Sequence, residues 1–378
     1  MSVRIAFLCT YSTPPRTLRM AKILARAGYD VHIIEWDRSG SKPKLERADG
    51  ITFKRLKLKA GYGLRIFYLI PIWLLFSLIQ LMLKNYTLMQ PQNLDCLIPA
   101  FLVTRFSRRR RIIYDLADFY GHAYLVGFPI ISQLASIVER LLIRRVDALI
   151  LVSERQLLQI GTKNLPKNLV YFYNAPEVDV KTVCRAENRS FSEHELTFDL
   201  FYGGILSYDR VRLLVNVINA VKGLPVKVII AGFGECEGIL KSLSESGKQV
   251  VFLGRLSHKK LLEYTMKANA ILLPYDPRIL NCRIGLPNKL FEAMLCESLI
   301  LAPHGTYMAE IVKKYQAGIV IDYNDVKELR KIIKETINIQ RNKISLILQN
   351  AKKLFFKKYN PRKMARYYLE LVNSLATK

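Results

Sequence analysis

The sequence lacks the patterns that mark a zinc-binding or disulfide-stabilised protein. Its six cysteines are far apart, none forms a Cys-x-x-Cys pair, and none of its five histidines is spaced to complete a zinc site. We therefore expect free thiols and a reducing, cytosolic environment. The amino-terminal apolar run, residues 4–10, is too short for a secretory signal and predicts a first strand instead. Short repeats and low-complexity tracts are also absent.

Acidic residues are scarce relative to basic ones. There are 31 Asp and Glu against 58 Lys and Arg, a formal net charge of +27, which predicts a polyanionic partner or surface. Much of this excess flanks one apolar segment, with Lys54, Arg55, Lys57, Lys59 and Arg65 before it and Arg105 and residues 108–111 after it. Because the sequence has no helix-turn-helix, zinc module or alternation of aromatic and basic residues, the charge favours an anionic membrane over nucleic acid.

The apolar segment, residues 66–83, runs for 18 residues without a charge. That length meets the lower limit for a spanning helix. Spanning would, however, place the first two expected strands, residues 3–9 and 31–35, on the opposite side of the bilayer from the later strands of the same sheet. We therefore expect a monotopic helix that lies at the membrane interface. The alternatives are a fully buried core helix and a helix in a dimer interface.

Strands alternate with helices along the whole chain, which predicts an α/β protein with two doubly wound parallel sheets. We expect a first Rossmann-like domain at residues 1–175, a polar linker at 176–196, a second domain at 197–352, and a helical segment at 353–378 that packs back on the first domain. The expected strands are residues 4–9, 31–35, 111–115, 148–152, 197–202, 226–231, 250–253 and 270–274, and the expected helices are 18–27, 131–144, 212–221 and 259–267.

The most informative motif is Asn281-Cys-Arg-Ile-Gly-Leu-Pro-Asn-Lys-Leu-Phe-Glu-Ala-Met294. Pro287 suits the first turn of a helix, so the backbone N–H groups that follow Gly285 can face an anion. Glu292 lies one turn past Asn288, about 7 Å along the helix from its start. A diphosphate at the helix start and a ribose at Glu292 would fit this spacing. The alternative is an ordinary amphipathic helix on which Glu292 is merely solvated.

Several motifs occur in a fixed order around this one. They are Pro14-Pro-Arg16, Tyr114-Asp-Leu-Ala-Asp118, Val152-Ser-Glu154, Asn174-Ala-Pro176, Gly203-Gly204, Gly232-Phe-Gly234 and the run from Asn281 to Pro303. Together they resemble the GT-B glycosyltransferases of family 4, which are retaining, nucleotide-sugar-dependent enzymes. The resemblance extends over most of the chain and implies two domains that face each other across a cleft.

The resemblance implies roles for individual residues. It implies donor binding by Gly203, Gly204, Gly232, Gly234, Gly285, Asn288 and Arg16, and catalysis by Arg210, Lys289 and Glu292. Arg210 and Lys289 would face the diphosphate, and Glu292 would accept hydrogen bonds from the ribose. Asn288 would steer the sugar or phosphate, and Gly232 to Gly234 would line the base. Arg16 would meet a donor or acceptor phosphate.

Two positions depart from the family pattern. Ile284 stands where members often have a second acid, and Ala117 aligns with a histidine near the reacting sugar, which leaves Asp118 and His122 as catalytic candidates in the first domain. The sequence has no Asp-x-Asp motif, so we expect neither a metal nor another cofactor, with basic residues neutralising the phosphates instead.

We therefore expect a retaining transferase that moves a sugar, a hexosyl group by the resemblance, from a nucleotide-diphosphate-sugar to a membrane-held acceptor. The acceptor would be a polyisoprenyl-linked or other lipid-linked glycan at the cytoplasmic face of the cell membrane. One alternative is the same transfer to a soluble or protein acceptor. Another is a catalytically silent, lipid-binding scaffold with this fold, which Ile284 and Ala117 favour.

Overall fold

The computed structural model describes residues 3–60, 65–107, 109–125, 127–176 and 197–377. The chain forms two compact units, one from the segment up to Tyr173 together with Arg362 onward, and the other from Asn174 to Pro361. Apart from Pro176, the linker expected at 176–196 lies outside the described residues. The predicted α/β class is confirmed, because each unit is built on one mainly parallel sheet.

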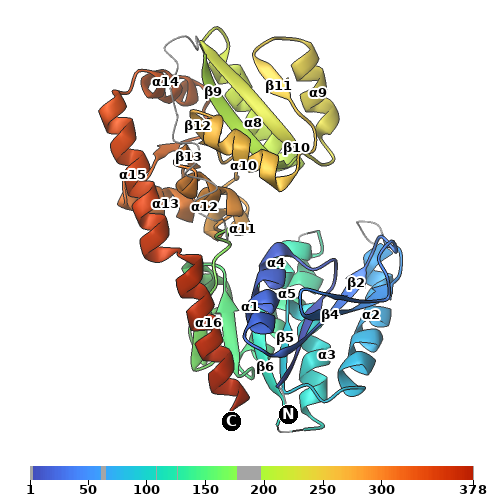
Figure 1. Cartoon of the computed structure of the whole chain (residues 1–378). Coiled ribbons are helices and arrows are strands. Elements are labelled where there is room, and N and C mark those ends of the chain that lie inside the picture. The colour runs from blue at the N-terminus through green and yellow to red at the C-terminus, as the bar shows by residue number, and fades with distance from the viewer. Residues whose placement is uncertain (1–2, 61–64, 108, 126, 177–196, 378) are drawn as a thin grey trace. The chain divides into compact units, whose positions relative to one another are not determined.

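The sheet of the first unit has eight strands in the order β3-β4-β2-β1-β5-β6-β7-β8 (Figure 1). Their bounds are β1 Arg4–Cys9, β2 Asp30–Asp37, β3 Leu45–Ala48, β4 Ile51–Lys57, β5 Leu88–Pro91, β6 Arg111–Leu116, β7 Ala148–Leu151 and β8 Asn168–Tyr171. All neighbours are parallel except β3 and β4, which form an antiparallel hairpin. Strands β1 and β7 are largely apolar on both faces and buried, as is typical of parallel sheets.

The β3–β4 hairpin at the sheet edge was not predicted. Its turn consists of Asp49 and Gly50, both with positive φ (52° and 75°). Asp-Gly is a preferred pair for a two-residue turn in which both residues have positive φ. The sequence therefore contained a local signal for this hairpin.

Helices cover both faces of this sheet. Their bounds are α1 Pro15–Arg26, α2 Arg65–Met82, α3 Leu94–Thr104, α4 Tyr120–Tyr124, α5 Pro129–Ile143, α6 Leu157–Ile160 and α16 Pro361–Ala376. Gln90 of β5 contacts Met20 of α1 and Tyr368 of α16, so these two helices share one face. Side chains of α2, α3 and α5 join the strands in a single hydrophobic cluster that includes Met89, the neighbour of Gln90, on the other face.

Helix α2 coincides closely with the apolar segment expected at 66–83. It buries Trp73, Ser77 and Leu81 against the sheet, whereas Tyr68 and Leu75 are exposed. A fully buried core helix is therefore wrong for this segment, because one side of α2 faces outward. In the part of the chain that the structure describes, none of the helices combines the length and apolar character needed to cross a bilayer.

The last helix packs on the first unit, as expected, but it begins later than predicted. Residues 353–358 still belong to α15 (Arg341–Lys358) of the second unit. From Arg362 onward, the chain packs on the first unit. There the hydroxyl of Tyr368 donates a hydrogen bond to Oε1 of Gln90 at 2.5 Å, and Tyr29 bonds Asn373.

The sheet of the second unit has six parallel strands in the order β11-β10-β9-β12-β13-β14. Their bounds are β9 Phe198–Ile205, β10 Val226–Phe233, β11 Val250–Phe252, β12 Ala270–Leu272, β13 Leu299–Pro303 and β14 Ile319–Ile321. The helices are α8 Tyr208–Val221, α9 Glu237–Glu245, α10 His258–Lys267, α11 Leu280–Ile284, α12 Asn288–Leu295, α13 Tyr307–Lys314, α14 Val326–Ile337 and α15. A hydrophobic cluster formed by the strands with α8 and α14 makes the core on one side of this sheet.

Helix α5 of the first unit directs its one acidic residue inward. The carboxyl of Glu139 is fully buried, accepting hydrogen bonds from the Tyr114 hydroxyl at 2.5 Å and the Tyr120 amide at 2.9 Å. Burial raises the pKa of Glu139 to about 8, even though these two hydrogen bonds favour the carboxylate. Most Glu139 carboxyls are therefore protonated at pH 7 in the folded protein.

This raised pKa predicts a pH-dependent stability difference between the wild type and Glu139→Gln. A glutamate in the unfolded chain has a pKa of about 4.3. Between that pH and pH 8, the folded state therefore holds a proton that the unfolded state releases. Relative to the variant, the wild type should lose stability as pH rises from 5 to 8, by at most about 1.4 kcal/mol per pH unit. Urea unfolding of both proteins at pH 5, 6.5 and 8 measures this difference. Parallel pH profiles would contradict the buried neutral carboxyl.

Candidate active site

The candidate residues of the second unit lie where its parallel strands end. Gly203 and Gly204 are not in a loop but in the strand, near the end of β9, and Gly232 and Gly234 lie at the end of β10. A Cβ atom added to Gly232 would lie 1.9 Å from the carbonyl oxygen of Gly204, so the two strand ends approach too closely for a side chain. This edge is where open α/β sheets bind ligands.

Glu292 forms the centre of the site. It lies on α12 and is 2% exposed, with Oε1 accepting a hydrogen bond from Nε2 of His258 at 2.9 Å and Oε2 contacting Nζ of Lys289 at 2.6 Å. Burial favours the neutral acid, but the contacts with His258 and Lys289 outweigh it, and the net pKa of Glu292 is lowered. The alternative in which Glu292 is a solvated surface residue is therefore wrong: it is a buried carboxylate in contact with Lys289 and His258.

His258 was not predicted from the sequence. It is the first residue of α10, whose N-cap Ser257 accepts a hydrogen bond from the Lys260 amide. Its imidazole covers Glu292 from the solvent side, with the His258 side chain 61% exposed and that of Glu292 2% exposed. The two residues are 34 positions apart on different helices, so no local spacing signals their contact.

Arg210 lies on α8, the helix that follows β9. Its guanidinium stacks over the ring of Tyr275 at 4.8 Å from the centroid, and its Nη1 donates to the carbonyl of Ile205 at 3.4 Å. Its buried Nε has no hydrogen-bond partner, and no carboxylate of the described residues lies within ion-pair distance of it. Arg210 therefore places a positive charge that has no carboxylate within ion-pair distance on the helix that follows β9.

A second ionic cluster fixes the loop between β12 and α11, and it too was not predicted. Asp276 is 3% exposed and contacts Nη2 of Arg212 and of Arg278, each at 2.6 Å. The hydrogen bonds from Arg278 and then Arg212 lower the pKa of Asp276 to about 2. This ion pair joins the start of α8 to the loop that leads to Gly285, and so holds the two halves of the candidate site together.

The loop before α12 differs from the family pattern in a way that the structure explains in part. Ile284 is 5% exposed and packs in the interior at the end of α11. At Gly285, a Cβ atom would lie 2.5 Å from the carbonyl oxygen of Asn281, which requires glycine in this turn. Asn288 is exposed at the first position of α12, next to the N–H groups of the first turn.

Three predicted residues, Arg16, Asp118 and His122, belong to the first unit and form a separate group. Arg16 is 5% exposed and pairs with the buried Asp115 at 2.8 Å, while its guanidinium stacks over Phe172. Its charge is therefore matched by a buried carboxylate, which differs from a free phosphate-binding cation. The Asp118 amide donates to Oδ1 of Asn93 at 3.3 Å, which fixes the loop after β6.

His122 lies one turn further on, in α4. Its ring packs edge-on against Phe119, and its Nδ1 lies 3.4 Å from Nε2 of Gln159. Burial and then the charge of Arg140 lower the pKa of His122, so the neutral imidazole is favoured at pH 7. Because the Gln159 amide N–H can only donate, Nδ1 of His122 accepts and Nε2 carries the proton.

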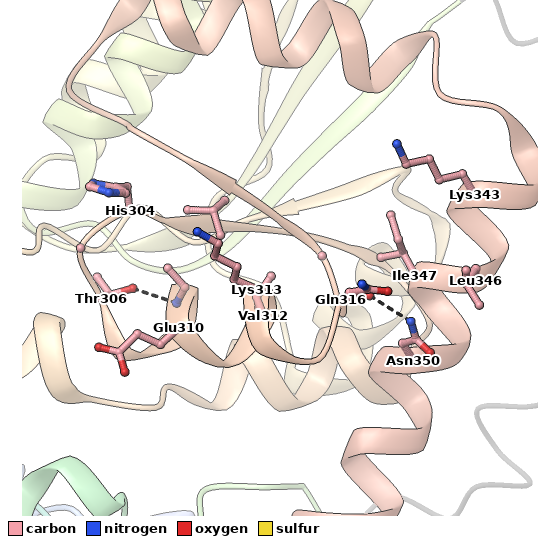
Figure 2. A pocket seen from close by; sticks show the side chains of 14 residues that line it. His304, Thr306, Glu310, Val312, Lys313, Gln316, Lys343, Leu346, Ile347 and Asn350 are labelled. Carbon is pink, nitrogen blue, oxygen red and sulfur yellow. Dashed lines mark hydrogen bonds between the residues drawn. The ribbon is translucent and has the colours of Figure 1, made fainter.

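A separate pocket of about 740 Å³ lies between α13, β14 and α15 (Figure 2). Val312, Val320 and Ile347 contribute apolar lining, and Lys313 and Lys343 lie on different helices around it. It shares no residue with the Glu292 cluster. Among the described residues, no group of His, Cys, Asp and Glu side chains is placed to hold a metal ion.

Two family models match the chain. The model for glycosyl transferases group 1 matches residues 198–338, and that for a glycosyl transferase 4-like domain matches residues 13–175. These matches lie in the second and first unit, respectively, and include the glycines at the ends of β9 and β10, Arg210 and α12 in one and Asp118 and His122 in the other. No curated protein matches the sequence significantly.

Solved structures share the fold over almost the whole chain. Sucrose-phosphate synthase from Thermosynechococcus elongatus is 15% identical, with a TM-score of 0.77 and 99% of each chain covered. An E. coli trehalose-6-phosphate structure bound with UDP-2-fluoro glucose is 10% identical (TM-score 0.70, 99% of each chain). Anabaena HepE in complex with UDP-glucose is 17% identical (TM-score 0.65, 98% and 99% covered). With both units matched by glycosyltransferase models, the chain is a glycosyltransferase with the GT-B fold.

Proposed function

We propose that the protein transfers a sugar, with retention of configuration, from a nucleoside-diphosphate sugar bound in the second unit. The observation that carries this proposal is the buried, ionised Glu292, held by Lys289 at the start of α12. A carboxylate there can accept two hydrogen bonds from the vicinal hydroxyls of a ribose. Two of the structural neighbours hold UDP-glucose or a fluorinated analogue, which supports a donor of this class.

Charge neutralisation is the proposed source of catalysis. The leaving nucleoside diphosphate gains negative charge as the glycosidic bond breaks, so cations fixed beforehand stabilise the transition state more than the ground state. Arg210, on the helix that follows β9, has an Nε without a hydrogen-bond partner. Lys289 contacts Glu292 and would also face the phosphates. We expect this pair and the first-turn N–H groups of α12 to replace a bridging metal.

Glu292→Ala should weaken nucleotide binding. Calorimetric titration of UDP and GDP into the wild type should give a Kd on the order of 10 µM for one of them. Loss of hydrogen bonds to a charged acceptor should weaken that binding about 10- to 100-fold. Glu297→Ala is the matched control, because Glu297 lies just beyond the same helix and pairs with Lys352 instead. If the wild type binds neither nucleotide, the proposed donor site around Glu292 is wrong.

Arg210→Ala should slow the chemical step more than it weakens donor binding. Removing one group that stabilises developing negative charge should lower kcat about 10²- to 10³-fold. The rate is followed as release of nucleoside diphosphate from the donor that calorimetry selects. Arg330→Ala is the control, since Arg330 donates to the carbonyls of Ala220 and Lys222 near the other end of α8. Equal losses in both variants would contradict the role of Arg210.

We propose that the first unit receives the acceptor at the ends of β1 and β6. His122 would donate through Nε2 to an acceptor oxygen, and Asp118 would take the proton of the attacking hydroxyl. The acceptor would be a lipid-linked glycan, because α2 presents apolar side chains outward next to basic sequence. The protein would then be attached to the cytoplasmic face of the cell membrane.

Transfer to a soluble acceptor is the second candidate. It is favoured by the names of the structural neighbours, which include a sucrose-phosphate synthase and trehalose-phosphate synthases. These neighbours are at most 17% identical to this chain, so their acceptors carry over only as a hypothesis.

Product partition distinguishes the two acceptors. The protein is incubated with radiolabelled donor, together with either a bacterial lipid extract or a panel of soluble sugar phosphates, and the mixture is extracted with butanol. A lipid-linked acceptor places label in the butanol phase only when lipid is present, and this label should disappear in Asp118→Asn. Label that stays in water with a sugar phosphate would overturn the lipid-linked acceptor and support the soluble one.

A further inference from the structure

Helix α5 buries polar residues and exposes apolar ones, the reverse of a typical amphipathic helix at a protein surface. The residues that it buries include Ser136 and Glu139, whereas its outward side is apolar. That side consists of Ile130 (83% exposed), Leu134 (62%), Ile137 (46%) and Leu141 (51%). These four residues follow one another at helical spacing and form a continuous stripe. Soluble surfaces rarely place a row of large aliphatic side chains in water, so this stripe indicates a partner.

Helix α2 has a similar outward stripe. Its members are Tyr68, Ile72, Leu75, Ile79 and Met82, each between 45% and 82% exposed and spaced three or four residues apart. Its inward side holds Trp73, whose ring stacks on Trp36 of β2. Since Trp73 fixes the rotation of α2 on the sheet, the apolar stripe cannot turn inward without losing this packing.

The two stripes belong to one face of the first unit. Helices α2 and α5 each pack on α3, and all three contribute to the same hydrophobic cluster on the sheet. Figure 1 shows α2 and α3 side by side. At the end of α3, Leu102 and Phe106 are also exposed, at 47% and 72%. We call the outward side chains of α2, α3 and α5 the three-helix face.

Basic side chains lie along one end of the three-helix face. Each of these helices leads into a strand of the parallel sheet, so all three helices end beside the amino-terminal ends of the strands. Exposed cations gather there: Lys84, Arg105, Arg109, Arg144 and Arg145. The three helices carry only two acids, Asp95 and Glu139, and both are buried. Asp30 and Asp147, which lie where β2 and β7 begin, pair with arginines.

We propose that the three-helix face docks on a bilayer leaflet that contains anionic lipids. The apolar stripes would enter the boundary between headgroups and acyl chains, and the basic edge would contact anionic headgroups. A second copy of the chain fits less well, because the three helices offer no exposed acid to pair with those cations. The inference deepens the proposed function and rests on it for the membrane-held acceptor, but docking is measurable without sugar transfer.

Vesicle binding by matched variants tests this proposal. Leu134→Asp/Ile137→Asp removes two apolar contacts from α5, and Leu158→Asp/Ile239→Asp changes equally exposed residues elsewhere (67% and 46%). Sedimentation with phosphatidylcholine vesicles containing one-fifth phosphatidylglycerol should show binding of the wild type and the control. The α5 variant should partition about a hundredfold more weakly, from the loss of two buried aliphatic side chains. Nucleotide titration of each variant shows that the donor site is intact.

The basic edge is tested by Arg144→Glu/Arg145→Glu. Each cation near an anionic surface contributes about fivefold in partition, so this variant should lose on the order of 25-fold or more on anionic vesicles. It should show little change on pure phosphatidylcholine.

Two outcomes would overturn the proposal. One is unchanged vesicle binding by the α5 variant. The other is a wild-type dimer in analytical ultracentrifugation that ignores vesicles and dissociates in the α5 variant, which would make the face an interface between copies. If the α5 variant loses vesicle binding but still binds nucleotide, docking is supported. If the wild type does not bind nucleotide at all, only the proposed donor site is contradicted.

Discussion

A parallel sheet that is covered by helices on both faces leaves a ligand one place to meet polar groups, the carboxyl-terminal ends of the strands. Both units of this protein obey that constraint. Glu292 and Arg210 lie beyond strand ends in the second unit, and Asp118 and His122 do so in the first. The helices and the hydrophobic clusters matter to function chiefly because they hold these edges in place.

Charges at these edges are fixed by partners before any ligand arrives. Glu292 contacts His258 and Lys289, Asp276 joins α8 to the loop before α12, and Asp115 matches the charge of the buried Arg16. Fixing a charged group in advance costs stability, because burial of charge is unfavourable even when it is paired. The benefit is that little reorganisation is needed when charge develops on a substrate. Not every charged group is satisfied in this way, since the buried Nε of Arg210 has no hydrogen-bond partner.

Local sequence predicted the start of α12, on which Glu292 lies, but few of the long-range contacts around it. The start of α12 could be inferred because Pro287 and the spacing to Glu292 act within one turn, and the glycines at the ends of β9 and β10 because a close backbone approach demands glycine. The contact of His258 with Glu292 could not be inferred, since it joins different helices. The inverse amphipathicity of α5 was hidden for another reason: an apolar stripe indicates a buried side by default, and only the fold reveals that Ser136 and Glu139 take that side instead.

The return of α16 to the first unit has a consequence for biosynthesis. Tyr29 and Tyr368 bond residues that are 344 and 278 positions away in sequence, so the first unit is closed by α16, which is made after the second unit. The second unit is continuous and can fold while the chain is still growing. Until α16 has been made, the surface around Gln90 lacks the helix that covers it. The nascent first unit therefore exposes the apolar surface that α16 will cover until that helix is made. We expect chaperones to be needed during this interval, and truncation within α16 to be especially damaging.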